Sequence, residues 1–190
     1  MTPWLGVDVG GKRKGLHIAV VDDRGVVTLA GGLDVAGVVA HVDATRPALV
    51  GIDGPRRCAP DGHTAREDER MLARSVCAIR WTPDAAAVRS SAYFAWIIHG
   101  LELFEAITAR GVEAIEVFPT ASWTRWHGAR GRRSRAAWSR EGLAAMRLAG
   151  VPDRTNQDQR DAIAAAVTAR QYARGQTESI GEIVVPARRW

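Results

Sequence analysis

The feature that most constrains the fold of this chain is an acidic residue inside an apolar strand near its start. Residues 4–9 are apolar apart from a glycine and Asp8, and residues 16–22 form a second apolar stretch. Burying a carboxylate is costly unless it is paired, protonated or bound to a metal. The turn between the two strands includes Gly10 and Gly11, and glycines permit tight turns and close approach to a ligand. It also contains three cations, Lys12, Arg13 and Lys14. This combination favours a metal or phosphate site at the end of the hairpin.

The rest of the chain predicts an α/β fold with a mixed five-stranded sheet flanked by helices. Three antiparallel strands open it, the third over residues 26–30, and parallel additions follow over 48–53 and 112–118. The stretch 48–53 is continuously apolar, as expected of a strand that is buried on both faces. Residues 183–186 predict a short edge strand or a docked extension. Helical spacing is present in five segments, 35–42 behind a cap at Asp34, 64–78, 93–109, 141–150 and 155–174.

The length of 190 residues suits one domain with one core. We expect a single domain over 1–190 with a helical insertion at roughly 56–110 and a basic Trp/Arg segment at 123–140. The two cysteines form no CxxC pair, which argues against a disulfide scaffold or a zinc ribbon. The sequence has no apolar run of membrane-spanning length and no basic-then-apolar leader, so we expect a cytoplasmic protein.

The basic excess has two interpretations. The net charge is +5, and all but two of the 26 basic residues are arginines, which is typical of a genome base bias but also of a protein that binds a polyanion. Segment 123–140 interleaves tryptophan with arginine and has no acid, a pattern suited to exposed bases and phosphates. Its candidate phosphate-binding residues are Arg125, Arg130, Arg132 and Arg133. Equally, the tryptophans could be core residues and the arginines a solvated face. His17, in a core strand, is expected to be a satisfied core residue.

Four aspartates stand where strands end or a helix begins. Asp8 lies in the first strand, Asp53 ends the fourth, and Asp158 and Asp161 share one face of the late alanine-rich helix. If the first and fourth strands are neighbours, these carboxylates converge and repel one another unless a divalent cation neutralises them. Oxygen ligands suit Mg²⁺ or Mn²⁺. Each acid also has a structural explanation of its own, in a turn, at a helix N-terminus or in a surface ion pair; Asp8 has the weakest.

Four motifs in this order resemble the family catalogued as domain of unknown function 429 (DUF429), predicted nucleases with a ribonuclease-H-like fold. They are Gly6-Val7-Asp8-Val9-Gly10-Gly11, Gly51-Ile52-Asp53-Gly54-Pro55, Ile115-Glu116-Val117-Phe118-Pro119 and Asp158-Gln159-Arg160-Asp161-Ala162-Ile163. The last is also similar to the late-helix motif of RuvC-type resolvases. The resemblance implies metal ligation by Asp8, Asp53 and Asp161, Asp158 as a fourth candidate, and a Glu116 that faces the catalytic site. The chain departs from the family at Phe118, Thr120 and Gln157, where members commonly have acidic or histidine residues.

The leading hypothesis is therefore a divalent-metal-dependent nuclease that uses Mg²⁺ or Mn²⁺ and acts on nucleic acid, with a homodimer as the expected assembly. Phosphate would be neutralised by cations near the acids, for which the candidates are Lys12, Lys14 and Arg70. Two alternatives stay open: an actin-like or sugar-kinase-related phosphotransferase that binds a nucleotide on the glycine-rich turn, and a noncatalytic binding protein. Against the phosphotransferase, the hairpin occurs only once and the chain is short. Metal and ATP titrations would separate the three.

Overall fold

We describe a computed structural model that covers residues 2–11 and 14–188. The strands are β1 (Trp4–Val9), β2 (Leu16–Val21), β3 (Val26–Leu33), β4 (Val50–Asp53), β5 (Ala114–Val117), β6 (Thr177–Ile180) and β7 (Ile183–Pro186). The helices are α1 (Val35–Thr45), α2 (Glu67–Ser75), α3 (Ala85–Ser90), α4 (Ala95–Thr108), α5 (Pro119–His127), α6 (Arg135–Met146) and α7 (Gln157–Ala173), with a 3-10 turn, η1 (Ala92–Phe94), before α4. No helix in the described part of the chain is long and apolar enough to cross a membrane.

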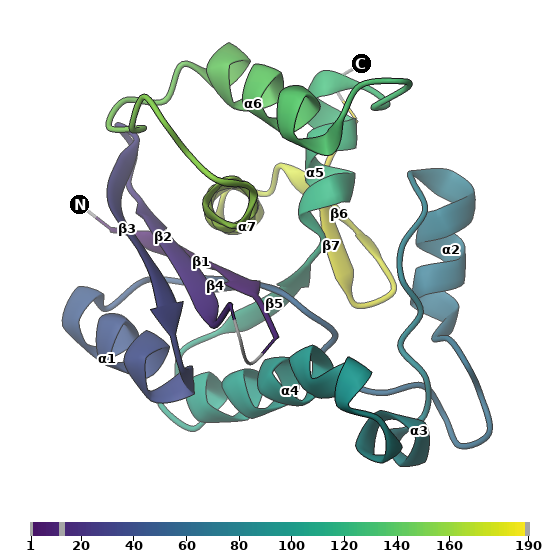
Figure 1. Cartoon of the computed structure of the whole chain (residues 1–190). Coiled ribbons are helices and arrows are strands. Elements are labelled where there is room, and N and C mark those ends of the chain that lie inside the picture. The colour runs from purple at the N-terminus through teal and green to yellow at the C-terminus, as the bar shows by residue number, and fades with distance from the viewer. Residues whose placement is uncertain (1, 12–13, 189–190) are drawn as a thin grey trace.

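The described strands form one mixed sheet in the order β3-β2-β1-β4-β5-β7-β6 (Figure 1). β1, β2 and β3 are antiparallel, whereas β4, β5 and β7 add in parallel. The predicted mixed sheet is confirmed, but its strand count is wrong because the sheet has seven strands and not five. The missed strand, β6, is polar and half-exposed, so it lacks an apolar alternation. It pairs with β7, which therefore lies inside the sheet and not at its edge.

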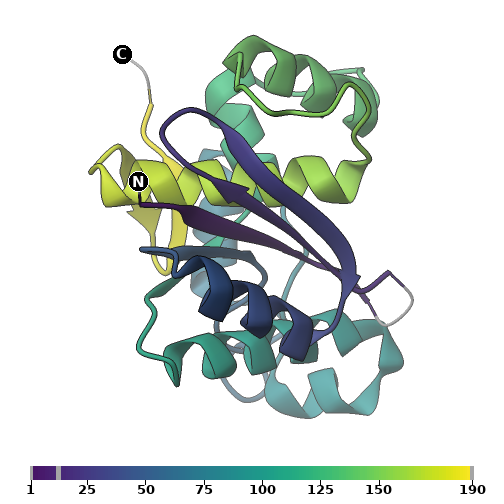
Figure 2. The ribbon, with the colours of Figure 1, turned by 90° about the vertical axis from the view of Figure 1, so that its left-hand side faces the viewer.

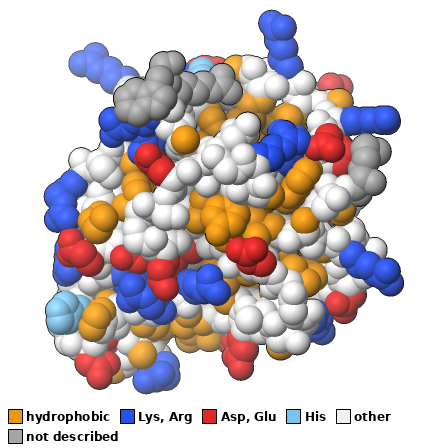
Figure 3. Space-filling model, turned by 180° about the vertical axis from the view of Figure 1, so that it is seen from behind, with side chains coloured by type: hydrophobic (Ala, Val, Ile, Leu, Met, Phe, Trp, Pro, Cys, Tyr) orange, Lys and Arg blue, Asp and Glu red, His pale blue; other side chains and the backbone are white. Residues whose placement is uncertain are grey.

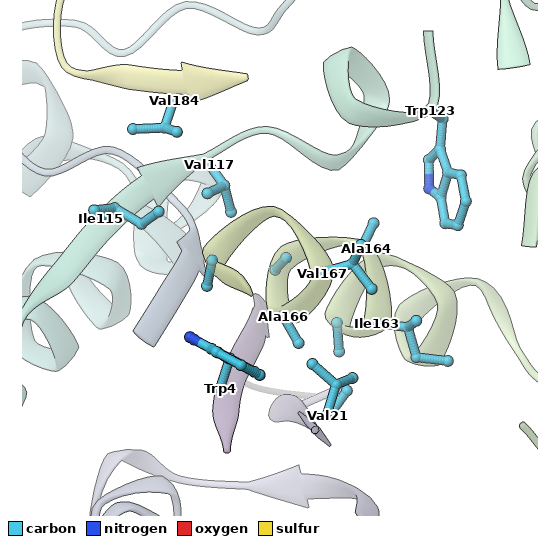
Figure 4. Close-up of a cluster of buried hydrophobic side chains, with 14 of the residues drawn as sticks. Trp4, Val21, Ile115, Val117, Trp123, Ile163, Ala164, Ala166, Val167 and Val184 are labelled. Atoms are coloured by element: carbon cyan, nitrogen blue, oxygen red, sulfur yellow. The ribbon is translucent and has the colours of Figure 1, made fainter. Parts of the chain in front are cut away.

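Helices cover both faces of the sheet, as Figures 1 and 2 show. α1 and α4 lie on one face, and α7, with α5 and α6 beyond it, lies on the other. Each face has its own apolar core, because alternate residues of a strand point to opposite sides. In Figure 4 the side chains of α7 lie between Trp4 and Val21 of the sheet and Trp123 of α5. α7 is thus the central helix of the layer in which α5 and α6 also pack.

Close packing of α7 on the sheet depends on glycine in two central strands. A Cβ at Gly6 would lie 2.1 Å from the backbone nitrogen of Ala166, and one at Gly51 would lie 2.5 Å from the carbonyl oxygen of Ala165. The helix side of the contact is rich in alanine, so the two backbones approach closely. This contact fixes where the N-terminal end of α7 lies over β1 and β4.

The helix boundaries follow the sequence with local differences. Asp34 caps α1, accepting a hydrogen bond from the backbone N–H of Gly37 at 2.8 Å, as predicted. The helix predicted over 64–78 is shorter, since α2 covers Glu67–Ser75. Segment 123–140 is divided between α5 and α6 by a turn in which Gly128 and Gly131 adopt positive φ.

Candidate metal centre

Two aspartates lie side by side at the ends of adjacent parallel strands. Asp8 of β1 and Asp53 of β4 are register partners. Partners in register point to the same face of a sheet, and residues two positions apart share a face. Gly6 and Gly51 contact α7, so Asp8 and Asp53 also face the α7 side. The predicted convergence of the first and fourth strands is therefore present in the structure.

α7 brings two further acids to this pair. The helix begins behind Asn156, whose side chain accepts a hydrogen bond from the backbone N–H of Gln159 at 2.7 Å. Asp158 and Asp161 follow in its first turns, three residues apart and on one face. The charge of Asp161 acts on both strand aspartates, and that of Asp158 acts on Asp8. The predicted acids thus act on one another where β1 and β4 end, and of the four, Asp8 and Asp158 belong to the described group whose ligand atoms lie within 4.8 Å of one another.

The two strand aspartates form no ion pair with the described residues. Burial, reinforced by the charges of Asp161 and Asp158, raises the pKa of Asp8 to about 8. Burial and the charges of Asp8 and Asp161 likewise raise the pKa of Asp53 well above its ordinary value. Without a further cation, Asp8 therefore holds a proton at neutral pH.

Asp161, in contrast, is firmly held by protein groups. Its Oδ2 accepts a hydrogen bond from Nη2 of Arg135 at 2.8 Å, and its Oδ1 accepts one from Nε1 of Trp123 at 3.2 Å. Nε2 of Gln157 lies 3.0 Å from both oxygens. Arg135 also lowers the pKa of Asp8 and Asp53 by its charge. Sequence reasoning could not assign Arg135 and Trp123 to Asp161, because they come from α6 and α5, whereas Gln157 lies one turn before Asp161 on α7 and could have been found from its spacing.

The outer side of the cluster is formed by Asp158, Lys14 and a histidine. Lys14 Nζ donates to Asp158 Oδ1 at 3.1 Å, so this predicted phosphate-binding residue lies at the acidic site. His17 of β2 is the register partner of Asp8. One ligand atom each from Asp8, His17 and Asp158 lie within 4.8 Å of one another.

His17 is not the satisfied core residue that the sequence suggested, because its Nδ1 is buried with no hydrogen-bond partner. The hairpin register contained the missing signal, since it places His17 opposite Asp8.

Glu116 does not face the acidic cluster, and that prediction is wrong. Its register partner on β4 is Ile52, which belongs to the core between the sheet and α1 and α4. Glu116 therefore points to the face opposite Asp53. There its carboxylate is buried and accepts hydrogen bonds from the guanidinium of Arg66, one of them at 2.7 Å, and from the backbone N–H of Arg56 at 2.8 Å. Burial raises the pKa of Glu116, against the opposing effect of Arg66. In this structure, Glu116 connects β5 to the start of α2.

The tryptophans of the basic segment are not displayed for stacking on bases. Trp123 and Trp138 are 0% and 1% exposed. Trp126 is partly buried, and its Nε1 donates to Gln171 Oε1 at 3.1 Å. The interpretation of this segment as interleaved rings and cations on a surface is therefore wrong for its rings, because they form part of the core beneath α5 and α6.

The predicted phosphate-binding arginines fall into two groups. Arg125 is buried in an ion pair with Glu178, and Arg133 donates to backbone carbonyls of its own turn and to Glu141. Arg130 and Arg132 are exposed in the turn that leads to Arg135.

The remaining predicted cations lie elsewhere. Arg70, on α2, pairs with Glu67 at 3.6 Å, and Lys12 lies outside the described residues. On the face seen in Figure 3, basic and acidic side chains are interspersed.

The acids at the ends of β1 and β4 form a donor set that fits a divalent cation. Asp8 and Asp53 are adjacent, face the same side and have no ion-pair partner among the described residues. Carboxylate oxygens are the ligands that Mg²⁺ and Mn²⁺ prefer. A cation there would offset both the burial and the repulsion that raise the two pKa values. Asp158 is partly exposed and lies at the open side of the group.

Comparisons with solved structures agree with this architecture. A structure of RuvC from Thermus thermophilus is 17% identical, with a TM-score of 0.50, over 92% of this chain and 96% of that one. A structure of T. thermophilus RuvC in complex with a Holliday junction substrate is 15% identical, with a TM-score of 0.54, over the same shares of the two chains. At these identities the likeness establishes the fold alone, which is ribonuclease-H-like. The chain matches no curated protein.

The sequence profile of one family covers nearly the whole chain. It matches residues 6–184, from the first strand through to β7, and so includes all four acids of the cluster. The chain belongs to the family described as "Protein of unknown function (DUF429)".

Proposed function

We propose that this protein is a divalent-metal-dependent nuclease, a phosphodiesterase that acts on nucleic acid and uses Mg²⁺ or Mn²⁺. The observation that carries the proposal is the pairing of Asp8 with Asp53 on adjacent parallel strands, without a compensating ion pair among the described residues and with Asp158 and Asp161 above them. Acids that serve only the fold are normally paired or solvated, whereas these two are partly buried side by side without an ion pair among the described residues. The ribonuclease-H-like fold supports the same interpretation.

In this proposal, each residue has a distinct task. Asp8 and Asp53 would hold the cation, and a bound divalent cation would supply positive charge for the attack of water on phosphorus and for the leaving oxygen. Asp158 adds an oxygen from the open side. Asp161 is the fourth acid, and its contacts with Arg135, Trp123 and Gln157 fix its position.

Cations beside the site would receive the phosphate backbone. Lys14 lies against Asp158, and Arg130 and Arg132 are exposed in the turn before Arg135, which itself contacts Asp161. A substrate phosphate that approached the acids would therefore pass near three positive side chains. We further propose a cytoplasmic protein that acts as a homodimer, and branched DNA belongs among the substrates to test because one structural neighbour is bound to a Holliday junction.

The test combines metal binding with cleavage. We expect calorimetry to detect Mn²⁺ binding to the wild type, and labelled single-stranded, duplex and branched DNA and RNA to reveal Mn²⁺-dependent cleavage of at least one of them. Asp8→Asn should abolish both. Asp43→Asn is a matched control because its exposed carboxylate pairs with Arg110 on the far side of the sheet. ATP binding without Mn²⁺-dependent cleavage would instead support a phosphotransferase, and the absence of both would support a noncatalytic protein.

A further inference from the structure

A histidine lies beside the acidic cluster and, among the described residues, makes no hydrogen bond or ion pair with its acids. His17 faces Asp8 across the β1–β2 hairpin, and one of its ring nitrogens lies within 4.8 Å of ligand oxygens of Asp8 and Asp158. Its Nδ1 is buried with no hydrogen-bond partner. Leaving such a buried group unsatisfied is energetically unfavourable. Lys14 donates to Asp158 and does not supply a partner for His17 Nδ1.

The neighbouring strand is shaped to receive this imidazole. Between the pairs Leu16–Leu33 and Ile18–Ala30, β3 has one residue more than β2, so Gly31 and Gly32 together lie opposite His17. Bulges of this kind re-aim side chains and are frequent next to active sites. A Cβ at Gly31 would lie 2.2 Å from His17 Cδ2 and 2.6 Å from Nε2. The ring edge that carries Nε2 therefore lies over glycine, and Nδ1 is the ring nitrogen that is buried without a partner.

We propose that His17 Nδ1 is a metal ligand, which together with oxygens of Asp8 and Asp158 forms a mixed nitrogen–oxygen site at the outer side of the cluster. This inference rests on the proposed function, because it extends the metal centre of Asp8. A neutral imidazole suits transition metals, whereas Mg²⁺ prefers all-oxygen sites. The nitrogen donor thus selects Mn²⁺ over Mg²⁺. The glycine bulge of β3 is the structural device that holds the ring in place for this purpose.

The decisive measurement is pulsed electron paramagnetic resonance of Mn²⁺ bound to the protein, which detects a directly coordinated ¹⁴N independently of activity. We expect ¹⁴N coupling in the wild type and its loss in His17→Gln. Mn²⁺ binding should weaken at least about 10-fold, since even the loss of an outer-shell partner costs metal affinity about 10- to 100-fold. His63→Gln, which removes an exposed loop histidine, is the matched control and should change neither quantity. Circular dichroism verifies that each variant is folded.

The outcomes separate this inference from the proposed function. Mn²⁺ that binds in an Asp8-dependent manner but without ¹⁴N coupling, or with coupling that persists in His17→Gln, overturns the role of His17 and leaves the carboxylate centre intact. If Mn²⁺ does not bind, or binds equally to Asp8→Asn, the proposed metal centre fails and this inference fails with it.

A second pair of variants tests the glycine bulge without removing the ligand. Gly31→Ala introduces a methyl group that must displace the imidazole, so it should weaken Mn²⁺ binding and reduce the ¹⁴N coupling. In the His17→Gln background, the same substitution should cause no further loss of Mn²⁺ affinity, because the displaced ring is absent. Equal losses in the two backgrounds would contradict the proposed positioning.

Discussion

Removing the two strand aspartates should change how the stability of the metal-free protein depends on pH. The pKa of Asp8 is about 8 in the folded chain, against 3.8 for the free side chain. Between these values the folded protein holds a proton that the unfolded chain releases, so unfolding becomes more favourable as the pH rises. The contribution of the Asp8 proton to the free energy of unfolding is complete below pH 3.8 and is lost as the pH rises through 8. One proton corresponds to about 1.4 kcal/mol per pH unit, or about 2.7 kcal/mol between pH 5 and pH 7.

The assay is urea denaturation in EDTA at pH 5 and pH 7, followed by circular dichroism. Relative to Asp8→Asn/Asp53→Asn, the wild type should lose at least about 2.7 kcal/mol more of its free energy of unfolding over this interval, which is the contribution of Asp8. The raised pKa of Asp53 acts in the same direction. Asp43→Asn, which removes a mostly exposed carboxylate, should behave like the wild type.

The reasoning is refuted if the wild type and the double variant show the same difference between pH 5 and pH 7. Mn²⁺ supplies a second check on the same groups, because it competes with the protons. At about 100 times its dissociation constant it should stabilise the wild type by about 2.7 kcal/mol at pH 7. The stabilisation should be smaller at pH 5 and absent from the double variant.

Three further perturbations test other parts of the structure. Gly6→Ala should lower the melting temperature, since its methyl group meets the α7 backbone and such overpacking costs about 1–3 kcal/mol, whereas Gly11→Ala, with no atom within 4 Å, should not. Arg66→Met should cost about 3–5 kcal/mol in denaturation experiments, because it leaves buried glutamates unpaired; a neutral result would contradict the buried network. Arg130→Gln/Arg132→Gln should reduce the slope of log affinity against log salt for nucleic acid by about 1–2, and an unchanged slope would exclude this turn from the interface.

The sequence alone predicts the framework of the acidic cluster. Asp8 is identified as an acid inside an otherwise apolar first strand, and Asp53 as an acid at the end of an apolar later strand. Both are evident because the local spacing of apolar residues indicates which strands are buried. The late helix was equally evident, with Asp158 and Asp161 on one of its faces. The mixed sheet followed from the order of these elements, although the polar strand β6 lacked the apolar alternation that would have revealed it.

The position of Glu116 could not be predicted, because it depends on strand register. Successive residues of a strand face opposite sides of the sheet, so a shift of one position decides whether an acid joins the cluster or leaves it. The pairing of Ile52 with Glu116 sets this register across the long connection between β4 and β5. No local pattern specifies that alignment, and the outcome is a buried ion pair with Arg66 on the other face.

What the sequence determined by itself is where the acids stand in their own strands and helix, because periodicity and turn residues act over a few positions. Only the tertiary structure decided what each acid contacts: Arg135 and Trp123 on Asp161, Lys14 on Asp158, and His17 beside Asp8. These contacts join residues far apart in the chain, except for the hairpin pair. The packing of α7 on the glycines of the sheet, and of α5 and α6 on α7, determines which residues contact the acids. No periodic pattern in the sequence indicates packing of this kind.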